Sequence, residues 1–145
     1  MNKNIEIEIQ LTNNNATVPS KKHDSDIGYD ISSVVDALIP SNEVKLINTG
    51  ISMNLPNQCS GFVLPRSGLA LKHKITLINS PGLVDPGYTG ELMVPLINHG
   101  RTDYQISIGD RIAQLVLINT NSVEFKIVDN LPDTERSTGG FGSTD

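Results

Sequence analysis

The chain has 145 residues, 37% of them hydrophobic, so it can build one ordinary core and is expected to form one domain. Its formal net charge is −5 and its 11 Lys and Arg residues are scattered, which argues against nucleic acid as a partner while leaving a small polyanion possible. The single cysteine excludes an internal disulfide, and no apolar run reaches signal-peptide or membrane-span length, so we expect a cytoplasmic protein without a membrane partner.

Alternating apolar and polar residues predict a first strand at residues 4–11, with its aliphatic side chains on one face. The same alternation returns at residues 51–55 and 123–127. Denser apolar runs predict further strands that are buried on both faces. These runs lie at residues 75–78, 92–97 and 112–118.

Turn-forming clusters of Gly, Pro, Asn and Ser separate these segments, so only short strands fit between them. One helix is expected to start within residues 67–72, with Ser67 as its N-cap. The pattern therefore predicts an all-β fold, an antiparallel jelly roll or sandwich with at most one short helix.

The end of the chain differs in composition from the rest. Beyond residue 128 the only large apolar side chains are Leu131 and Phe141, and three glycines add backbone freedom. We predict a β-fold domain at residues 1–128 and a flexible arm at residues 129–145. The arm could act as a lid, with Arg136 on phosphate and Phe141 over a base; its alternative is a disordered terminus.

Five turn segments combine glycine with charged or hydroxyl residues, at positions where a rigid β scaffold exposes functional groups. They lie at residues 24–30, 65–70, 82–91, 109–115 and 135–144. Taken singly, each has an ordinary structural explanation, such as a capped turn or a local surface ion pair between Asp110 and Arg111.

The chemistry of these segments nevertheless suits a nucleotide. Arg66 and Ser67 bring a guanidinium and a hydroxyl to the predicted helix start, where backbone amides can also hold phosphate oxygens. The first and third segments place carboxylates beside Tyr29 and Tyr88, and carboxylates suit Mg²⁺ or the activation of a water. Gln114 stands out because an amide inside an apolar run needs hydrogen-bond partners if it is buried.

In order and in spacing, these segments resemble the five motifs of the trimeric dUTPase family. The matching residues are 28–30, 65–70, 82–91, 109–115 and 136–144. Five ordered matches are far more specific than any one of them. The resemblance implies a homotrimer of antiparallel jelly-roll subunits (the dUTPase-like β-clip) with active sites shared between chains. Such an enzyme, a dUTP diphosphatase, hydrolyses dUTP to dUMP and pyrophosphate with Mg²⁺.

The resemblance also assigns roles to residues. The groups expected to hold the phosphates are Arg66, Ser67, Gly68, Gln114 and, from a neighbouring chain, Arg136. Asp30 is expected to order Mg²⁺ through its water shell. Asp85 matches the general base that orients a water for in-line attack on the α-phosphorus, and Ser67, Gln114 and Arg136 complete the catalytic set.

The nucleoside is expected to lie against the hairpin of the third motif. The residues that would contact it are Asn79, Leu83, Val84, Asp85, Tyr88 and Met93, with Phe141 and Gly142 of the arm covering the base. A close-fitting hairpin would exclude the 5-methyl of thymine, and Tyr88 would exclude a ribose 2′-hydroxyl. Ile27 and Thr89 depart from the family pattern without removing a catalytic group.

Two alternatives remain at this stage. The dCTP deaminase family resembles dUTPase in fold and in its Arg-Ser turn, but it needs a positioned glutamate at the pyrimidine ring. Besides Asp85, Glu91 is the acidic residue near the hairpin that could serve. The other alternative is a non-catalytic jelly roll that binds nucleotide, for which a complete set of catalytic residues would have no use.

Overall fold

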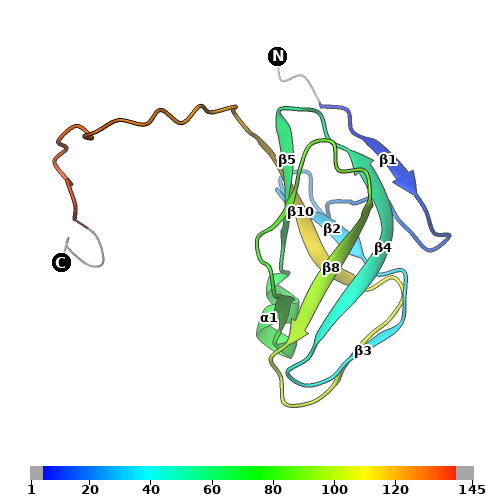
Figure 1. Ribbon diagram of the computed structural model, residues 1–145. Helices are drawn as coiled ribbons and strands as arrows, with labels where there is room; N and C mark the ends of the chain where they lie inside the picture. The colour runs from blue at the N-terminus through cyan, green and yellow to red at the C-terminus, as the bar shows by residue number, and fades with distance from the viewer. Residues whose placement is uncertain (1–4, 140–145) are drawn as a thin grey trace.

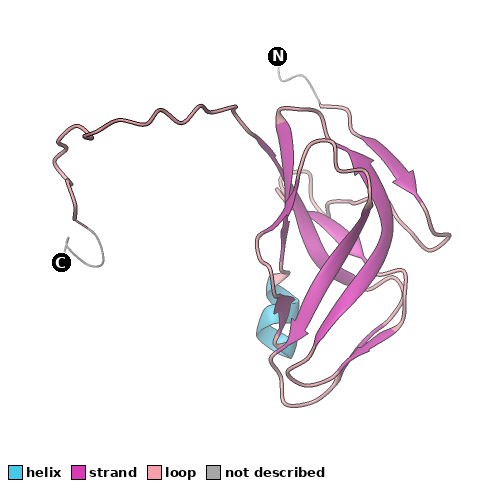
Figure 2. Ribbon diagram, in the orientation of Figure 1, coloured by secondary structure: helices cyan, strands magenta, loops and turns pink. Residues whose placement is uncertain are grey.

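Residues 5–139 are described by the computed structural model, and they form ten strands and one short helix, α1 (Ser67–His73) (Figures 1 and 2). One four-stranded antiparallel sheet has the order β1 (Glu8–Leu11), β4 (Val44–Asn54), β8 (Glu91–Asn98), β6 (Ile75–Leu77). The other has the order β2 (Tyr29–Ser32), β10 (Arg111–Asn119), β5 (Cys59–Leu64), β7 (Gly82–Val84). A two-stranded sheet pairs β3 (Ala37–Ile39) with β9 (Tyr104–Ile106). The all-β prediction with one short helix is confirmed.

The core is a single cluster of aliphatic side chains contributed by all three sheets. Its most buried members include Ile31 from β2, Ile47 from β4, Val94 from β8, Ile106 from β9 and Ile112 from β10. Full burial of each such side chain stabilises the fold by about 1.5–3 kcal/mol. This shared core holds the turns at the strand ends in fixed relative positions, and those turns carry the candidate functional residues.

The strands differ from the predictions in length and in burial. β4 begins at Val44, well before the predicted strand at residues 51–55, and a bulge interrupts its pairing with β8 between Asn48 and Ser52. β8 is not buried on both faces: within it buried and more exposed residues alternate, and the side chain of Met93 is 39% exposed. One face of β8 therefore lies on the surface of the single chain.

Ser67 is the first residue of α1 and not its N-cap, so that prediction was wrong. The N-cap is Arg66, which has extended dihedral angles (φ −91°, ψ 130°) and makes no side-chain capping bond. The chain leaves β5 in an extended conformation, so the helix cannot begin before Ser67. The helix ends at His73, and the left-handed conformation of the C-cap residue Lys74 lets its amide donate to the carbonyls of Leu69 and Ala70.

The arm beyond β10 runs away from the body of the molecule (Figure 1). Its alternating segment at residues 123–127 forms no strand, which corrects the prediction, and Phe125 and Ile127 are 95% and 96% exposed. The alternation has no sheet edge of its own chain beside it, so the residues stay extended and unpaired within the described part of the chain. The predicted domain boundary at residue 128 remains a prediction. Within residues 5–139, no helix has both the length and the apolar content that a membrane crossing requires.

Candidate functional site

Asp30 is the centre of a group of charged side chains on the sheet that contains β2 and β10. It lies in β2 directly opposite Gln114 of β10. Its Oδ1 is 2.9 Å from Nε of Arg66, and its Oδ2 is 3.1 Å from Nη1 of Arg111. The carboxylate therefore holds two guanidinium groups, which come from positions far apart in the sequence.

Arg66 is fixed from two sides. It follows the end of β5, the other neighbour of β10, and its Nη1 donates to the carbonyl of Arg111 at 3.3 Å. Together with the bond to Asp30, this uses two of the five N–H donors of the guanidinium. The side chain is 26% exposed, so its remaining donors can meet a ligand while the group stays in place.

The Gln114 amide makes a hydrogen bond whose partner was not predicted from the sequence. Its Nε2 donates to the carbonyl of Pro65 at 2.9 Å, which ties β10 to the turn before α1. A Cβ atom at residue 28 would overlap Gln114 Oε1, so only glycine lets β2 approach the amide this closely. The close approach explains the glycine at position 28 of the first motif.

These residues surround a hollow of about 420 Å³, which we call the phosphate half-site. Its lining includes Gly28, Asp30, Arg66, Ser67, Gly68, Gln114, Arg111 and Lys22. The structure thus brings together all the residues of the β body that were expected to hold phosphate or metal. Sequence reasoning did not find Arg111 and Lys22 as part of this group.

The ordinary explanation of the fourth segment taken alone, a local ion pair between Asp110 and Arg111, is wrong. Asp110 instead accepts a hydrogen bond from the backbone amide of Ser107, and the Arg111 side chain pairs with Asp30. The pairing of β10 with β2 brings Arg111 to the Asp30 side chain, whereas Asp110 lies in the turn before β10. The pair of Arg111 with Asp30 could not be predicted from the sequence, because 81 residues separate the two.

The residues expected to contact the nucleoside line a second hollow of about 330 Å³, the nucleoside half-site. They are Asn79, Leu83, Val84, Asp85, Tyr88 and Met93. The Tyr88 hydroxyl donates to the carbonyl of Glu91 at 3.1 Å, which folds its ring back over the turn. Asp85 is exposed at the start of this turn, just after β7.

The two half-sites lie far apart on one chain. Val84 pairs with Gly61 near the start of β5, whereas Arg66 follows the end of the same strand. Continuing this register places Asp85 opposite Ser60, six residues before Arg66, which at about 3.3 Å per residue is roughly 20 Å along the strand direction. The two half-sites are therefore separate on this chain.

The arm residues are not brought to either half-site of their own chain. Arg136 lies on the extended arm, where its Nε donates to the carbonyl of Gly139 at 3.1 Å. Phe141 and Gly142 were expected to cover the base, and both lie outside the described residues.

The side chains around Asp30 fit a Mg²⁺ ion only if the ligand supplies most of its coordination. Among residues 5–139 there is no group of three or more His, Cys, Asp or Glu side chains that could hold a metal ion. Mg²⁺ commonly keeps several waters and binds through one or two carboxylates together with substrate phosphates. Asp30 can contribute one carboxylate in this way, since its side chain is 20% exposed.

Glu91 does not have the free carboxylate that deamination would require. Its Oε1 accepts a hydrogen bond from the amide of Gly50 at 2.8 Å, and its Oε2 accepts one from Nδ2 of Asn48 at 3.1 Å. Both oxygens thus hold β4 rather than face a base. This arrangement disfavours the deaminase alternative.

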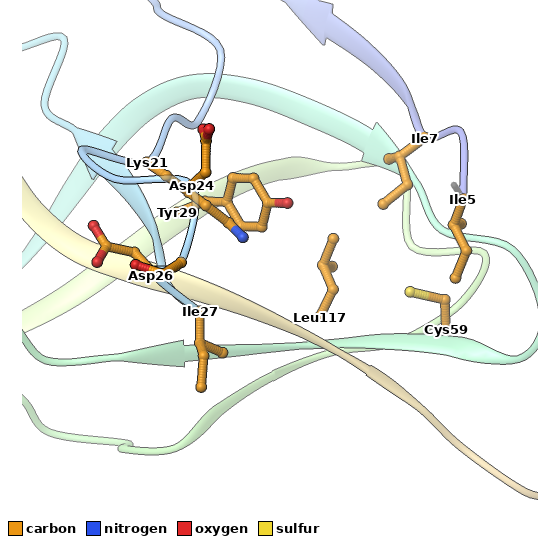
Figure 3. Close-up of a pocket in the computed structure, with 10 residues that line it drawn as sticks. Ile5, Ile7, Lys21, Asp24, Asp26, Ile27, Tyr29, Cys59 and Leu117 are labelled. Atoms are coloured by element: carbon orange, nitrogen blue, oxygen red, sulfur yellow. The ribbon is translucent and has the colours of Figure 1, made fainter. Parts of the chain in front are cut away.

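A third hollow, of about 820 Å³, contains none of the predicted site residues (Figure 3). Ile5, Ile7 and Cys59 lie at one end of the view and Asp26 at the other. Burial raises the pKa of the Cys59 thiol, so the thiol stays protonated and unreactive near neutral pH. Asp26 and Ile27 also line the phosphate half-site, so the two hollows are neighbours.

The chain matches known proteins over nearly its whole length. Residues 14–145 match the family model described as dUTPase. The deoxyuridine 5′-triphosphate nucleotidohydrolase of Crocosphaera subtropica is 46% identical over 97% of this chain and 99% of its own length. The enzyme of the same name from Clostridium kluyveri is 48% identical, over 97% of this chain and 98% of its own length.

Solved structures show the same fold. A structure of the Staphylococcus bacteriophage 80alpha dUTPase with dUpNHpp has a TM-score of 0.90 and 27% identity, covering 97% of this chain and 98% of that one. A mutant dUTPase from phage phi11 of S. aureus, described with a structural Mg(II) ion, has a TM-score of 0.83 and 25% identity, covering 89% and 100%. The fold, the grouped residues and the relatives agree with the resemblance seen in the five motifs. The chain therefore belongs to the dUTPase family.

Proposed function

We propose that the protein hydrolyses dUTP to dUMP and pyrophosphate, in active sites that each join the phosphate half-site of one chain to the nucleoside half-site of another. Membership of the dUTPase family supports the reaction. The observation that supports the arrangement is the separation of Arg66 from Asp85 along β5, because a site shared between chains can bring the two half-sites together. A homotrimer with shared sites is consistent with both the family membership and this separation.

In the phosphate half-site, positive charge and fixed donors oppose the charge of the triphosphate. Arg66 is held by Asp30 and by the Arg111 carbonyl, so its guanidinium is oriented before substrate arrives. Ser67 and Gly68 add a hydroxyl and backbone amides at the start of α1. Gln114, fixed to Pro65, completes the cradle. Pre-orientation of this kind lowers the barrier, because phosphoryl transfer depends on positioning and charge stabilisation.

In the nucleoside half-site, Asp85 accepts a proton from the attacking water. The new bond joins the water oxygen to the α-phosphorus, and the bond between that phosphorus and the oxygen bridging to the β-phosphate breaks. Pyrophosphate leaves with the bridging oxygen. Asn79 and the backbone of β7 present polar groups to the uracil edge, and Tyr88 packs against the deoxyribose.

Mg²⁺, bound to the triphosphate with Asp30 reaching it through water, would neutralise charge that builds on the phosphate oxygens. Arg136, Phe141 and Gly142 of a neighbouring arm would close over the bound nucleotide. The reaction would limit uracil incorporation into DNA and supply dUMP for dTMP synthesis. The cytoplasm is the expected location.

The substrate is tested by measuring pyrophosphate release from dUTP, dCTP, dTTP and UTP, each with and without Mg²⁺. We expect release from dUTP alone at a high rate, and a large loss without Mg²⁺. Ammonia production from dCTP would support the deaminase instead. Nucleotide binding without turnover of any substrate would support the non-catalytic alternative.

The shared site is tested by mixing two inactive variants, Arg66→Met and Asp85→Asn, after joint refolding. In mixed assemblies, some sites combine an intact phosphate half-site with an intact nucleoside half-site. Random mixing at equal amounts restores about a quarter of the wild-type activity if each site uses two chains. No recovery, with mixed trimers verified by light scattering and mass spectrometry, would place each site within one chain.

The arm is tested by deleting residues 134–145. We expect turnover to fall about a hundredfold, because the lid and the Arg136 guanidinium are lost. The assembly should keep its mass in light scattering. Full activity of the truncated protein would remove the arm from the mechanism.

A further inference from the structure

Glu91 lies where the nucleoside half-site joins the sheet. It is the first residue of β8 and pairs with Ser52 just beyond the bulge in β4. Its two carboxylate oxygens accept the bonds from Gly50 and Asn48, so they replace strand pairing that the bulge interrupts. Among the described residues its carboxylate forms no ion pair, and its contacts are all with uncharged donors.

The bulge in β4 that bonds to the Glu91 carboxylate is also held by the loop at residues 12–16. Gly50 has a positive φ of 64°, which favours glycine, and a Cβ there would lie 2.8 Å from Cβ of Asn13 and 2.9 Å from Cβ of Ala16. The carbonyl of Gly50 accepts a bond from the amide of Thr12 at 2.8 Å. Gly50 is therefore buried between the loop at residues 12–16 and the Glu91 carboxylate.

On its other side, Glu91 holds Tyr88. The Glu91 carbonyl accepts the hydrogen bond from the Tyr88 hydroxyl. A Cβ at Gly90 would lie 2.6 Å from Oη and 2.8 Å from Cζ of Tyr88, so the ring folds back only because residue 90 has no side chain. The ring is 47% exposed and faces the same hollow as Asp85. Its orientation follows the main chain of Glu91.

We propose that Glu91 is a specificity-determining positioning residue. Its carboxylate anchors the turn to the buried bulge of β4, and through its carbonyl it sets the orientation of Tyr88 and hence the preference for deoxyribose over ribose. The inference rests on the proposed function, in which Tyr88 packs against the sugar. It assigns Glu91 a role that acts through Tyr88, although Glu91 also lines the nucleoside half-site.

The test is the ratio of kcat/KM for dUTP to kcat/KM for UTP, measured in wild type and in Glu91→Gln. Glutamine keeps the shape but has one acceptor oxygen, so its NH₂ group faces one of the two donors. Loss of one bond and an unsatisfied donor should narrow the ratio about five- to twentyfold. The ratio does not depend on the fraction of folded enzyme, so partial misfolding does not affect the result.

A double-mutant cycle tests whether Glu91 acts through Tyr88. Tyr88→Phe removes the same link from the other side and should narrow the ratio by a similar factor. If the two residues act on one ring orientation, Glu91→Gln adds little in the Tyr88→Phe background. Independent, multiplicative effects on the ratio would contradict the proposed route.

Glu8→Gln is the matched control. Glu8 also accepts a bond from an asparagine on β4, since its Oε2 is 2.9 Å from Nδ2 of Asn54, but it lies at an exposed site on β1. The ratio of kcat/KM for dUTP to kcat/KM for UTP should be the same in Glu8→Gln as in wild type. If the wild-type protein does not hydrolyse dUTP, both the proposed function and the positioning role of Glu91 are wrong. If wild type prefers dUTP and Glu91→Gln keeps that preference, only the positioning role is overturned.

Discussion

The two half-sites are built by different kinds of contact. In the phosphate half-site, Asp30 holds Arg66 and Arg111 by ionic bonds between side chains from β2, the end of β5 and β10. In the nucleoside half-site, the bond from Tyr88 to Glu91 spans three residues of one turn. Loss of one charged group in the first half therefore releases several others, whereas a single change in the second half should disturb one turn.

Asp85→Asn should have the largest effect, because in the nucleoside half-site it alone takes the proton. We expect kcat to fall about a thousandfold, within the range for loss of a general base. Nucleotide binding should persist, since asparagine keeps the shape and most hydrogen bonds. Single-turnover kinetics and calorimetric titration with dUTP measure the two quantities. Unchanged turnover would remove Asp85 as the base.

Asp30→Asn should lower kcat/KM for dUTP about a hundredfold, because two charge-assisted hydrogen bonds that orient guanidinium groups are lost. A titration of Asp30→Asn with Mg²⁺ distinguishes two roles of Asp30, orienting the guanidinium groups and binding the metal. If Asp30 acts mainly by holding Arg66 and Arg111, excess Mg²⁺ does not restore activity. Recovery at high Mg²⁺ would make metal binding its main role.

Gly28→Ala should lower kcat/KM about tenfold. The added methyl group displaces the Gln114 amide, which then loses its bond to Pro65 and its place in the phosphate half-site. Steady-state kinetics measure this change. A wild-type kcat/KM in Gly28→Ala would show that displacement of the Gln114 amide does not affect catalysis.

The smallest effect is expected at Cys59, at the start of the strand that joins the two half-sites. Burial raises the pKa of this thiol from its ordinary value of 9.0, so the folded state binds the proton more tightly than the unfolded state does. The stability from this group is complete below pH 9 and declines as pH rises above it. Urea unfolding at pH 7 to 10.5 should show a shallower decline in Cys59→Ala. The pKa of Tyr104, raised by burial and by Asp110, should contribute a similar decline in both proteins.

Local pattern was sufficient to predict much of the fold. The turns at Gly87 and Gly109, both with positive φ, depend on neighbours in sequence, whereas the prediction that β8 is buried on both faces was wrong. Local pattern was not sufficient at residues 123–127, where alternation signals a strand but residues 5–139 offer no partner edge. It also misplaced the helix start at Ser67, because the extended conformation of Arg66 follows from its position after β5.

The sequence by itself determined the family and predicted the site residues that the five ordered motifs contain, but it did not predict that Arg111 and Lys22 join the phosphate half-site. Only the tertiary structure decided that Asp30 holds Arg111, that Glu91 holds Gly50, and that Arg66 and Asp85 stand apart along β5. The physical reason is that strand order and register, set by burial of the shared core, fix which side chains meet across long sequence separations. Spacing along the chain does not contain those distances.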